Sequence, residues 1–371
     1  MKLTGAELLH LRLPLVAPFE TSFGAQHERD LLLVRVLLDD QEGWGECVSM
    51  AAPVYSPEFN DSAALVLRNF LVPALAAADD LQAGLVAHLL ARFKGHQMAK
   101  AALEMAVLDA ELRAAGMSLA GFLGSVRATV PSGVSVGIHP SVPALLDSVA
   151  GYLDAGYVRI KLKIKPGWDL EPVRAVRERF GDIPLQVDAN TAYTLSDARH
   201  LARLDEFGLL LIEQPLGDED LTEHAELARQ LSTPVCLDES ITSAKAAADA
   251  IRLGACSVVN IKAGRVGGYL EARRVHDVCA ANGVAVWCGG MLETGLGRAA
   301  NMALAALPGF TLPGDTSASD RFYRRDIVTE PFRIQDGHIA VPTGPGLGVD
   351  VDPDALAAVT VHREYLPLDA G

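Results

Sequence analysis

Short apolar runs recur through the middle of the chain, and most of them end at a charged residue. They are rich in Val, Ile and Leu and are bounded by polar or Gly/Pro segments, which is typical of buried strands. Their spacing of about 25 residues leaves room for one helix and two loops, so the pattern predicts consecutive βα units. The predicted strands end near eight positions: Ser135, Lys163, Asp188, Glu213, Asp238, Lys262, Trp287 and Pro313. Eight such units predict an α/β fold of the (β/α)8 TIM-barrel type, in which chemistry takes place at the carboxyl ends of the strands.

Five of these strand ends carry charged side chains, separated by 25, 25, 25 and 24 residues. Lys163 and Lys262 are four strands apart, so in a closed eight-stranded barrel they face each other across the mouth. Asp188, Glu213 and Asp238 come from the three strands between them and converge on one side. Three unpaired carboxylates repel one another strongly in a medium less polar than water. We therefore expect a divalent cation between them.

Residues 1–127 do not share this spacing. They begin with strand-like segments such as residues 31–39 and continue into helical patterns such as residues 96–116. Strands followed by helices predict a separate α+β domain. Residues 128–318 are predicted to form the barrel, and residues 319–371 are predicted to return and pack on the N-terminal domain.

Composition and charge narrow the class of protein. The formal net charge of −15 disfavours nucleic acid as a partner, because phosphate binding requires a basic face. No uncharged stretch of about 20 apolar residues is present, so no membrane partner is expected. Five scattered cysteines without a CxxC pair are typical of a reduced, cytoplasmic protein. The GRVGG segment at residues 264–268 is too short for a dinucleotide fingerprint, so we expect no nucleotide cofactor.

Six motifs, in order along the chain, carry a family resemblance: KLKIKPGWD, QVDANTAY, LIEQPL, CLDES, NIKAGRVGG and PTGPGLGVD. Together they resemble the muconate-lactonizing subgroup of the enolase superfamily, and within it the o-succinylbenzoate synthase / N-acylamino acid racemase family. The resemblance implies a modified TIM barrel whose mouth is closed by the α+β domain as a cap, with a mobile loop near residues 16–26. It also implies a divalent metal ion, usually Mg²⁺ with Mn²⁺ or Co²⁺ as alternatives, and a homo-oligomer such as an octamer.

The resemblance also assigns roles to the five charged residues. The catalytic pair of the family matches Lys163 and Lys262. The three metal ligands match Asp188, Glu213 and Asp238. The chain departs from the family pattern at none of these positions.

Further residues are expected around this core of the site. Lys161 lies two positions before Lys163, hence on the same face of the strand, and is expected to bind the substrate carboxylate. Glu239, next to Asp238, is expected to support the metal site or to partner a lysine. The other residues expected to bind substrate, through matching segments or small strand-end positions, are Ser135, Asn190, Phe19, Phe23, Met50, Gly289 and Met291. The apolar ones could equally be core, and the asparagine could equally shape its turn.

Two opposed bases on either side of a planar intermediate predict racemisation. One lysine removes the α-proton of a carboxylate substrate, which gives an enediolate, and the other returns a proton to the opposite face. With the family resemblance, this predicts metal-dependent racemisation of N-acylamino acids, notably N-succinylamino acids. If the intermediate carries a β-leaving group, the same site performs syn-dehydration, which is o-succinylbenzoate synthase activity.

Several alternatives use the same residues. They are a dedicated o-succinylbenzoate synthase of menaquinone biosynthesis, a muconate-type cycloisomerase and a dipeptide epimerase. Epimerases of the superfamily hold a free ammonium with an Asp-x-Asp motif, and the corresponding stretch here, PGDTSASD, lacks that pair. A catalytically inactive barrel that acts as a binding protein is disfavoured, because both lysines and all three carboxylates are present.

Overall fold

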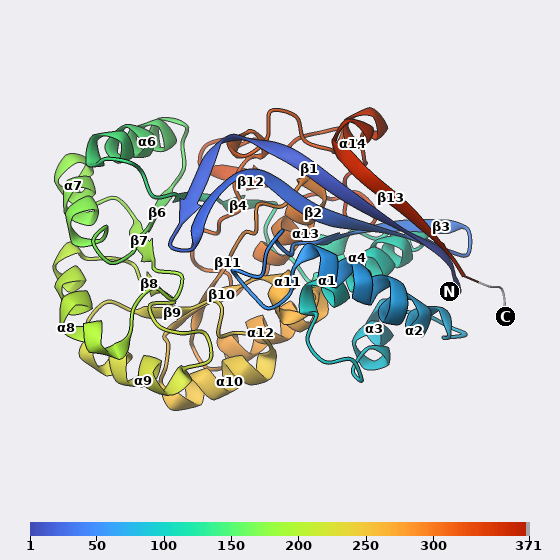
Figure 1. Ribbon diagram of the computed structural model, residues 1–371, viewed down its shortest axis with the longest axis horizontal. Coiled ribbons are helices and arrows are strands. Elements are labelled where there is room, and N and C mark those ends of the chain that lie inside the picture. The colour runs from blue at the N-terminus through green and yellow to red at the C-terminus, as the bar shows by residue number, and fades with distance from the viewer. Residues whose placement is uncertain (369–371) are drawn as a thin grey trace.

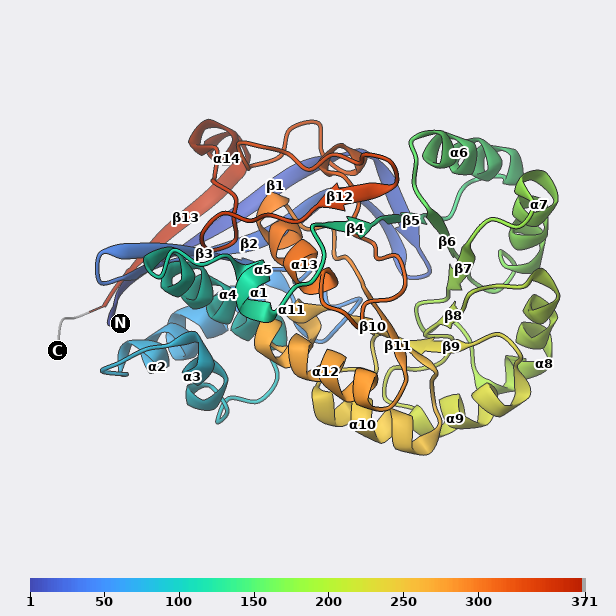
Figure 2. The ribbon, with the colours of Figure 1, turned by 180° about the vertical axis from the view of Figure 1, so that it is seen from behind.

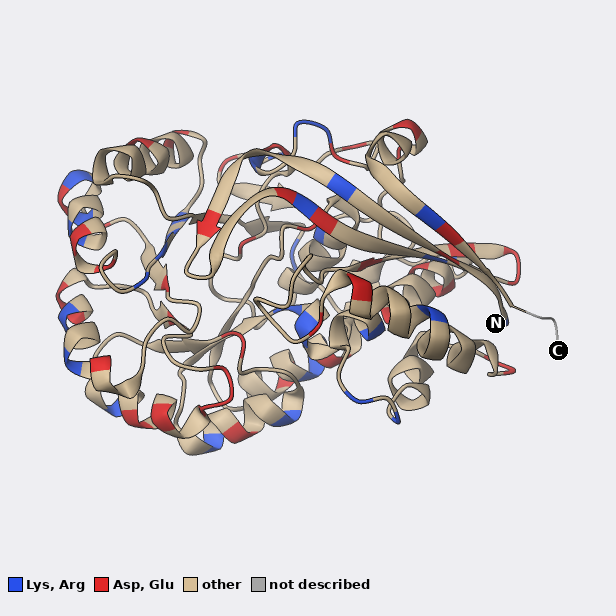
Figure 3. Cartoon of the chain, viewed as in Figure 1, with Lys and Arg blue, Asp and Glu red and all other residues tan. Residues whose placement is uncertain are grey.

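The computed structural model describes residues 1–368. A curled parallel sheet with helices on its outside forms one body, and an antiparallel sheet with short helices packs beside it (Figures 1 and 2). Within residues 1–368, no helix combines the length and the apolar character that crossing a membrane requires. Acidic and basic residues are interspersed along the outer helices of the parallel body (Figure 3).

The parallel sheet has seven regular strands, and strands that follow one another in the chain are neighbours in space. Short apolar runs form these strands because helices cover their outer face. The strands are β5 (Gly133–Val136), β6 (Arg159–Lys163), β7 (Leu185–Asp188), β8 (Ile212–Glu213), β9 (Val235–Leu237), β10 (Val258–Ile261) and β11 (Ala285–Cys288).

The eighth strand, expected to end near Pro313, is not a regular strand. Residues 310–315 instead make isolated parallel bridges to both edges of the sheet, Val286 with Phe310 and Ser132 with Gly314. Proline has no backbone N–H and cannot donate to a ladder, which is a physical reason for the irregularity. The segment nevertheless spans the gap between β11 and β5, so the modified barrel consists of seven strands and one irregular closing segment.

Helices connect the strands and surround the barrel (Figure 1). They are α6 (Val142–Asp154), α7 (Leu170–Phe180), η2 (Leu195–Asp197), α8 (Ala198–Leu201), η3 (Ala202–Phe207), α9 (Leu221–Gln230), α10 (Ala244–Leu253), α11 (Ala263–Val266), α12 (Tyr269–Ala281) and α13 (Gly295–Ala305). Several begin with a side-chain cap, as at Ser141, whose hydroxyl accepts from Ala144 N.

The second body is built on an antiparallel sheet in the order β13-β1-β2-β3. Its strands are β1 (Leu3–Thr21), β2 (Gly24–Leu38), β3 (Gln41–Cys47) and β13 (Thr360–Pro367), and its helices are α1 (Asn60–Val66), η1 (Leu67–Leu71), α2 (Val72–Ala76), α3 (Ala83–Leu89), α4 (Gln97–Ala114) and α5 (Leu119–Leu123). The C-terminal strand β13 thus pairs with the N-terminal strand β1. Helix α4 lies directly on β3, where a Cβ at Gly45 would collide with the carbonyl of Ala102. We call this body the cap.

The remaining elements lie between the barrel and β13 in the chain, or just before the barrel. They are β4 (Thr129–Pro131), η4 (Ser319–Arg321), β12 (His338–Ala340) and α14 (Pro353–Val359). β12 pairs with β4 and so holds the C-terminal segment beside the start of the barrel.

The segment near residues 16–26 is the tip of the long β1–β2 hairpin, where Thr21 pairs with Gly24. The tip contacts the barrel: Ser22 Oγ donates to Asn190 O at 3.1 Å, and Ile138 N donates to Glu20 O at 2.9 Å. It therefore reaches over the carboxyl ends of the barrel strands (Figure 1). Its expected mobility stays a prediction.

A buried carboxylate fastens the cap to the barrel. Glu46 of β3 accepts hydrogen bonds from Thr294 N at 3.0 Å, from Thr294 Oγ1 at 2.6 Å and from Gly297 N at 3.0 Å. These donors belong to the first turn of α13, whose backbone N–H groups have no helical partner and favour a negative charge. Despite these hydrogen bonds, burial raises the pKa of Glu46 to about 7.

Candidate active site

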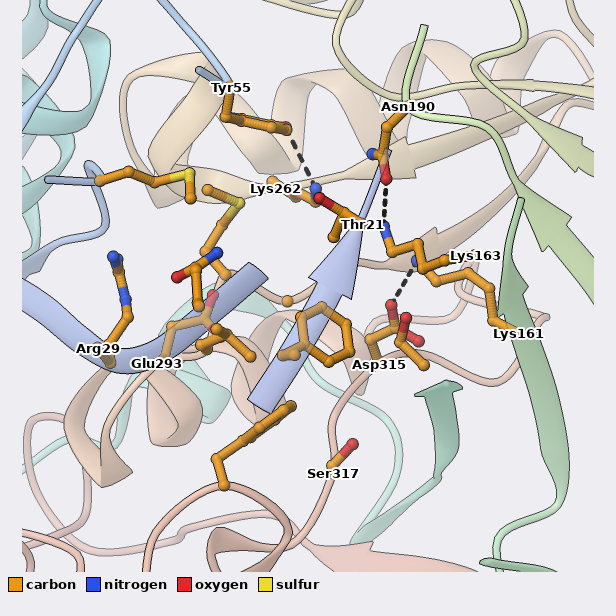
Figure 4. Close-up of a pocket in the computed structure, with 18 of the residues that line it drawn as sticks. Thr21, Arg29, Tyr55, Lys161, Lys163, Asn190, Lys262, Glu293, Asp315 and Ser317 are labelled. Atoms are coloured by element: carbon orange, nitrogen blue, oxygen red, sulfur yellow. Dashed lines mark hydrogen bonds and ion pairs between the residues drawn. The ribbon is translucent and has the colours of Figure 1, made fainter. Parts of the chain in front are cut away.

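A pocket lies between the hairpin tip of the cap and the mouth of the barrel (Figure 4). Nine of the residues expected in the site line it: Phe19, Phe23, Met50, Ser135, Lys161, Lys163, Asn190, Lys262 and Met291. The cap supplies the aromatic residues and the first methionine, and the barrel supplies the charged residues. Of these nine residues, the apolar ones thus come mainly from the cap and the three lysines from the barrel.

The two lysines expected to act as bases have matched surroundings. Lys163 ends β6, and its Nζ lies 2.7 Å from Asp188 Oδ2. Lys262 directly follows β10, and its Nζ lies 2.7 Å from Asp238 Oδ2. Both side chains line the same pocket although three strands, β7, β8 and β9, lie between β6 and β10 in the sheet order. Asn190 Oδ1 also accepts from Lys163 Nζ, at 2.6 Å.

Lys161 lies deeper, among three carboxylates. Its Nζ is 3.1 Å from Asp188 Oδ2, 3.0 Å from Glu213 Oε2 and 2.7 Å from Asp315 Oδ2. Burial alone would lower the pKa of Lys161, but the charges of Asp315, Glu213 and Asp188 raise it well above its ordinary value. The ring of Trp287 lies 4.8 Å from the ammonium group and belongs to the barrel core. The three carboxylates therefore favour the ammonium form of Lys161.

The carboxylates expected to bind metal are buried and contact cationic side chains. Asp188 and Glu213 pair in register on adjacent strands. Burial, followed by the charge of Asp188, raises the pKa of Glu213 well above its ordinary value. Burial would also raise the pKa of Asp188, but Lys163 and Lys161 hold it well below its ordinary value. Asp238 is wholly buried as well.

The donors in this region fit a divalent cation. Within residues 1–368, no three His, Cys, Asp or Glu side chains converge as a ready metal cluster, and cationic side chains face the carboxylates instead. Carboxylate oxygens are the ligands that Mg²⁺ and Mn²⁺ prefer. Two nearby oxygens, Asn260 Oδ1 and Glu239 Oε2, are buried without a hydrogen-bond partner. The donor chemistry of this region is therefore that of a site for a hard divalent cation.

Glu239 and Gly289 lie outside the pocket wall. Glu239 Oε1 accepts from Asn190 Nδ2 at 3.0 Å, so this carboxylate supports the residue that binds Lys163. A Cβ at Gly289 would come within 2.7 Å of Lys262 Cε. The small residue at this strand end therefore makes room for the side chains of Asn260 and Lys262, and not for substrate as the sequence predicts. Ser135 does line the pocket, and its Oγ is buried without a partner.

The structure adds three residues to the site that the sequence motifs did not identify. Arg265 of α11 contacts Asp238 and donates to Asn260 O at 2.6 Å. Tyr55 comes from a cap loop, and its hydroxyl accepts from Lys262 Nζ at 3.2 Å. Asp315 ends the irregular eighth segment. The 25-residue spacing pointed close to Asp315, whereas nothing periodic marks the loop that contains Tyr55.

Comparisons with known proteins agree with this architecture. Residues 4–124 match the mandelate racemase / muconate lactonizing enzyme N-terminal domain, and residues 144–355 match the enolase C-terminal domain-like family. The chain is 70% identical over 367 residues to an N-succinylamino acid racemase from Amycolatopsis sp, which covers 99% of this chain and 100% of that one. The chain belongs to the o-succinylbenzoate synthase / N-acylamino acid racemase family of the enolase superfamily.

Two other relatives show the breadth of this family. An o-succinylbenzoate synthase from Geobacillus kaustophilus is 49% identical over 346 residues, which are 93% of this chain and 92% of that one. The crystal structure of an enolase superfamily member from Listeria innocua superposes with a TM-score of 0.95 at 41% identity and covers 100% of both chains. Members of the enolase superfamily depend on a divalent metal ion.

Proposed function

We propose that this enzyme racemises N-succinylamino acids and related N-acylamino acids by proton transfer between two lysines. The observation that carries the proposal is the matched pair of lysines: Lys163 and Lys262 line one pocket, and each lies 2.7 Å from its own carboxylate. A dehydratase needs one base, whereas a racemase needs a proton donor and acceptor on each face of the substrate. The 70% identical relative named as an N-succinylamino acid racemase supports the same reading.

The chain's own residues account for the proposed steps. Lys161 binds the substrate carboxylate, because its ammonium group stays charged at the pocket floor. A neutral Lys163 or Lys262 removes the α-proton from one face, and the other lysine, as an ammonium, delivers a proton to the opposite face of the enediolate. The cap covers the pocket and excludes water, which strengthens each charge interaction inside.

Asp188, Glu213 and Asp238 would hold the divalent cation, for which Mg²⁺ fits the all-oxygen donor set. When bound, it supplies positive charge that offsets the second negative charge developing on the substrate carboxylate. The five cysteines are buried free thiols, which supports a reducing compartment such as the cytoplasm as the location.

The second candidate function is o-succinylbenzoate synthesis in the same pocket, supported by the 49% identity to the synthase relative. Syn-dehydration needs one lysine as base and the other as an ammonium that stabilises the anion. Burial would lower the pKa of Lys262, but Asp238 and then Tyr55 raise it above its ordinary value, which suits the ammonium role.

Racemisation in deuterated water tests the proposal. We expect purified protein with Mg²⁺ to convert N-succinyl-L-phenylalanine to the D-enantiomer, as followed by chiral chromatography, with deuterium entering the α-position, as followed by proton NMR. Dehydration to o-succinylbenzoate without any α-proton exchange in N-succinylamino acids would overturn racemisation in favour of the dedicated synthase.

A further inference from the structure

Lys163 and Lys262 differ in which body of the protein supplies their polar partners. The polar partners of Lys163 within residues 1–368 are Asp188 and Asn190, both from the barrel. Lys262 is held by Asp238 of the barrel and also by Tyr55 of the cap. The second base is therefore complete only when the cap is in place.

Tyr55 makes two kinds of contact with Lys262. Its hydroxyl oxygen accepts a hydrogen bond from Lys262 Nζ at 3.2 Å, and the centre of its ring lies 4.7 Å from the same nitrogen (Figure 4). A ring face at this distance attracts an ammonium group. The hydroxyl also lies 3.4 Å from both carboxylate oxygens of Asp238 and accepts from Arg265 Nη1 at 3.3 Å. Tyr55 thus fixes Lys262 together with the groups that surround it.

The loop that carries Tyr55 is fastened to the cap at its far end. Asn60 N donates to Met50 O at 2.9 Å and closes the loop. Glu58 accepts hydrogen bonds from Met98 N and Ala99 N at the first turn of α4, both at 2.8 Å. The loop therefore connects Lys262 of the barrel, through Tyr55, to the first turn of α4 in the cap, through Glu58.

Tyr55 also separates two cavities. It lines the substrate pocket together with Lys262, and it lines a second cavity formed by the cap loop, Glu239 and Arg265. Removal of its ring would join the two spaces beside Lys262. Asn190 also lines the substrate pocket and a further cavity beside Lys163, but this residue belongs to the barrel and not to the cap.

We propose that Tyr55 is the positioning residue for Lys262, through which the cap sets the geometry of one catalytic base and not of the other. The proposal rests on the two-lysine function above. Its consequence is a selective defect: changes at Tyr55 slow proton transfer on the substrate face served by Lys262 and spare the face served by Lys163.

Net racemisation cannot reveal this difference, because the equilibrium constant between two enantiomers is one and kcat/KM must fall equally in both directions. Exchange of the α-proton with deuterated water on a single face is free of that constraint. The single variants Lys163→Ala and Lys262→Ala identify which enantiomer each lysine serves, since each variant retains exchange for the enantiomer that faces the surviving lysine.

The test uses Tyr55→Phe, which keeps the ring, and Tyr55→Leu, which removes it, with Tyr365→Phe on the exposed face of β13 as the matched control. We expect Tyr55→Phe to slow exchange of the Lys262-facing enantiomer by about tenfold, as for a lost hydrogen bond to a charged group, and Tyr55→Leu to slow it further. Exchange of the Lys163-facing enantiomer should change by less than about twofold. An equal decrease for both enantiomers would overturn the proposal.

A second measurement needs neither metal nor substrate. Reductive methylation of the metal-free protein, mapped by mass spectrometry, should label Lys262 several-fold faster in Tyr55→Leu than in the wild type, with Lys163 unchanged. Unchanged labelling of Lys262 would contradict the contact between Tyr55 and Lys262. If the wild-type enzyme exchanges neither enantiomer, the proposed function fails, whereas the labelling result still decides the role of Tyr55.

Discussion

Lys161 and Asp315 form a buried ion pair across the pocket floor, with Nζ and Oδ2 2.7 Å apart. The other oxygen of Asp315 lies 2.8 Å from Nη1 of Arg159, which is wholly buried. Asp315 thus stands between two buried cations, Lys161 and Arg159. Through Lys161 it connects the irregular eighth segment of the barrel to the carboxylates of β7 and β8.

Replacement of Asp315 by Asn should destabilise the protein. It leaves buried Arg159 without its carboxylate partner, although Lys161 keeps Asp188 and Glu213, and removal of one partner from a buried pair costs up to about 3–5 kcal/mol of unfolding free energy. Urea denaturation measures the change. Asp147→Asn removes an exposed carboxylate 3.5 Å from Arg179 and should stay within about 0.5 kcal/mol of wild type. An Asp315→Asn protein with the unfolding free energy of the wild type would show that the ion pairs of Asp315 do not stabilise the fold.

Replacement of Glu213 by Gln should weaken metal binding and catalysis together. The amide keeps the size of the side chain but removes the charge shared with Asp188. We expect weaker Mg²⁺ binding in calorimetry and a loss of at least about a hundredfold in kcat, as for removal of an electrostatic stabiliser. Glu226→Gln, on the exposed face of α9, is the control. Full activity of Glu213→Gln, or of wild type in excess chelator, would refute a metal role.

Lys163→Ala and Lys262→Ala should each abolish net racemisation while retaining exchange for opposite enantiomers. Each variant lacks the acid or base on one face, so inversion cannot be completed, but the remaining lysine still exchanges the proton that faces it. Chiral chromatography measures the first effect and deuterium NMR the second. Wild-type racemisation by Lys262→Ala would exclude the two-lysine mechanism.

Replacement of Met50 or Phe19 should alter the choice of acyl group more than metal affinity. Both side chains line the cap side of the pocket, away from the charged floor. We expect Met50→Ala to raise kcat/KM for N-benzoyl relative to N-succinyl substrates by about tenfold, because pocket volume discriminates weakly. Met117→Ala, at an exposed position, is the control. Equal effects on every acyl group would contradict this assignment.

The stability difference between wild type and Glu46→Gln should depend on pH. The pKa of Glu46 is about 7 in the folded protein and ordinarily 4.5. Between these values the folded protein holds a proton that the unfolded chain has lost, so the contribution of Glu46 to the unfolding free energy falls as pH rises and levels off above about 7.

The Gln variant lacks this titration. Wild-type stability relative to Glu46→Gln should therefore decrease by on the order of 3 kcal/mol across this range. Denaturation at several pH values measures it, with Glu42→Gln at an exposed position of the same strand as the control. A difference that stays constant with pH would mean that Glu46 does not titrate there.

The sequence determined the repeating units and the ends of their strands. Lys163, Asp188 and Glu213 each stand at the last residue of a strand, and Asp238 and Lys262 stand one residue beyond. This was predictable because strand and helix lengths are local properties, and a constant period places equivalent residues at one end of the barrel. The family motifs identified the same residues.

Tertiary structure decided which distant residues complete the site. Tyr55 meets Lys262 across 207 positions of the chain, and Asp315 meets Arg159 across 156. Such contacts depend on how the cap docks and on how the barrel closes, and neither is encoded in a local pattern. The same reason accounts for two differences from expectation. The segment around Pro313 forms isolated bridges instead of a regular eighth strand. Gly289 makes room for Lys262, which follows the neighbouring strand β10.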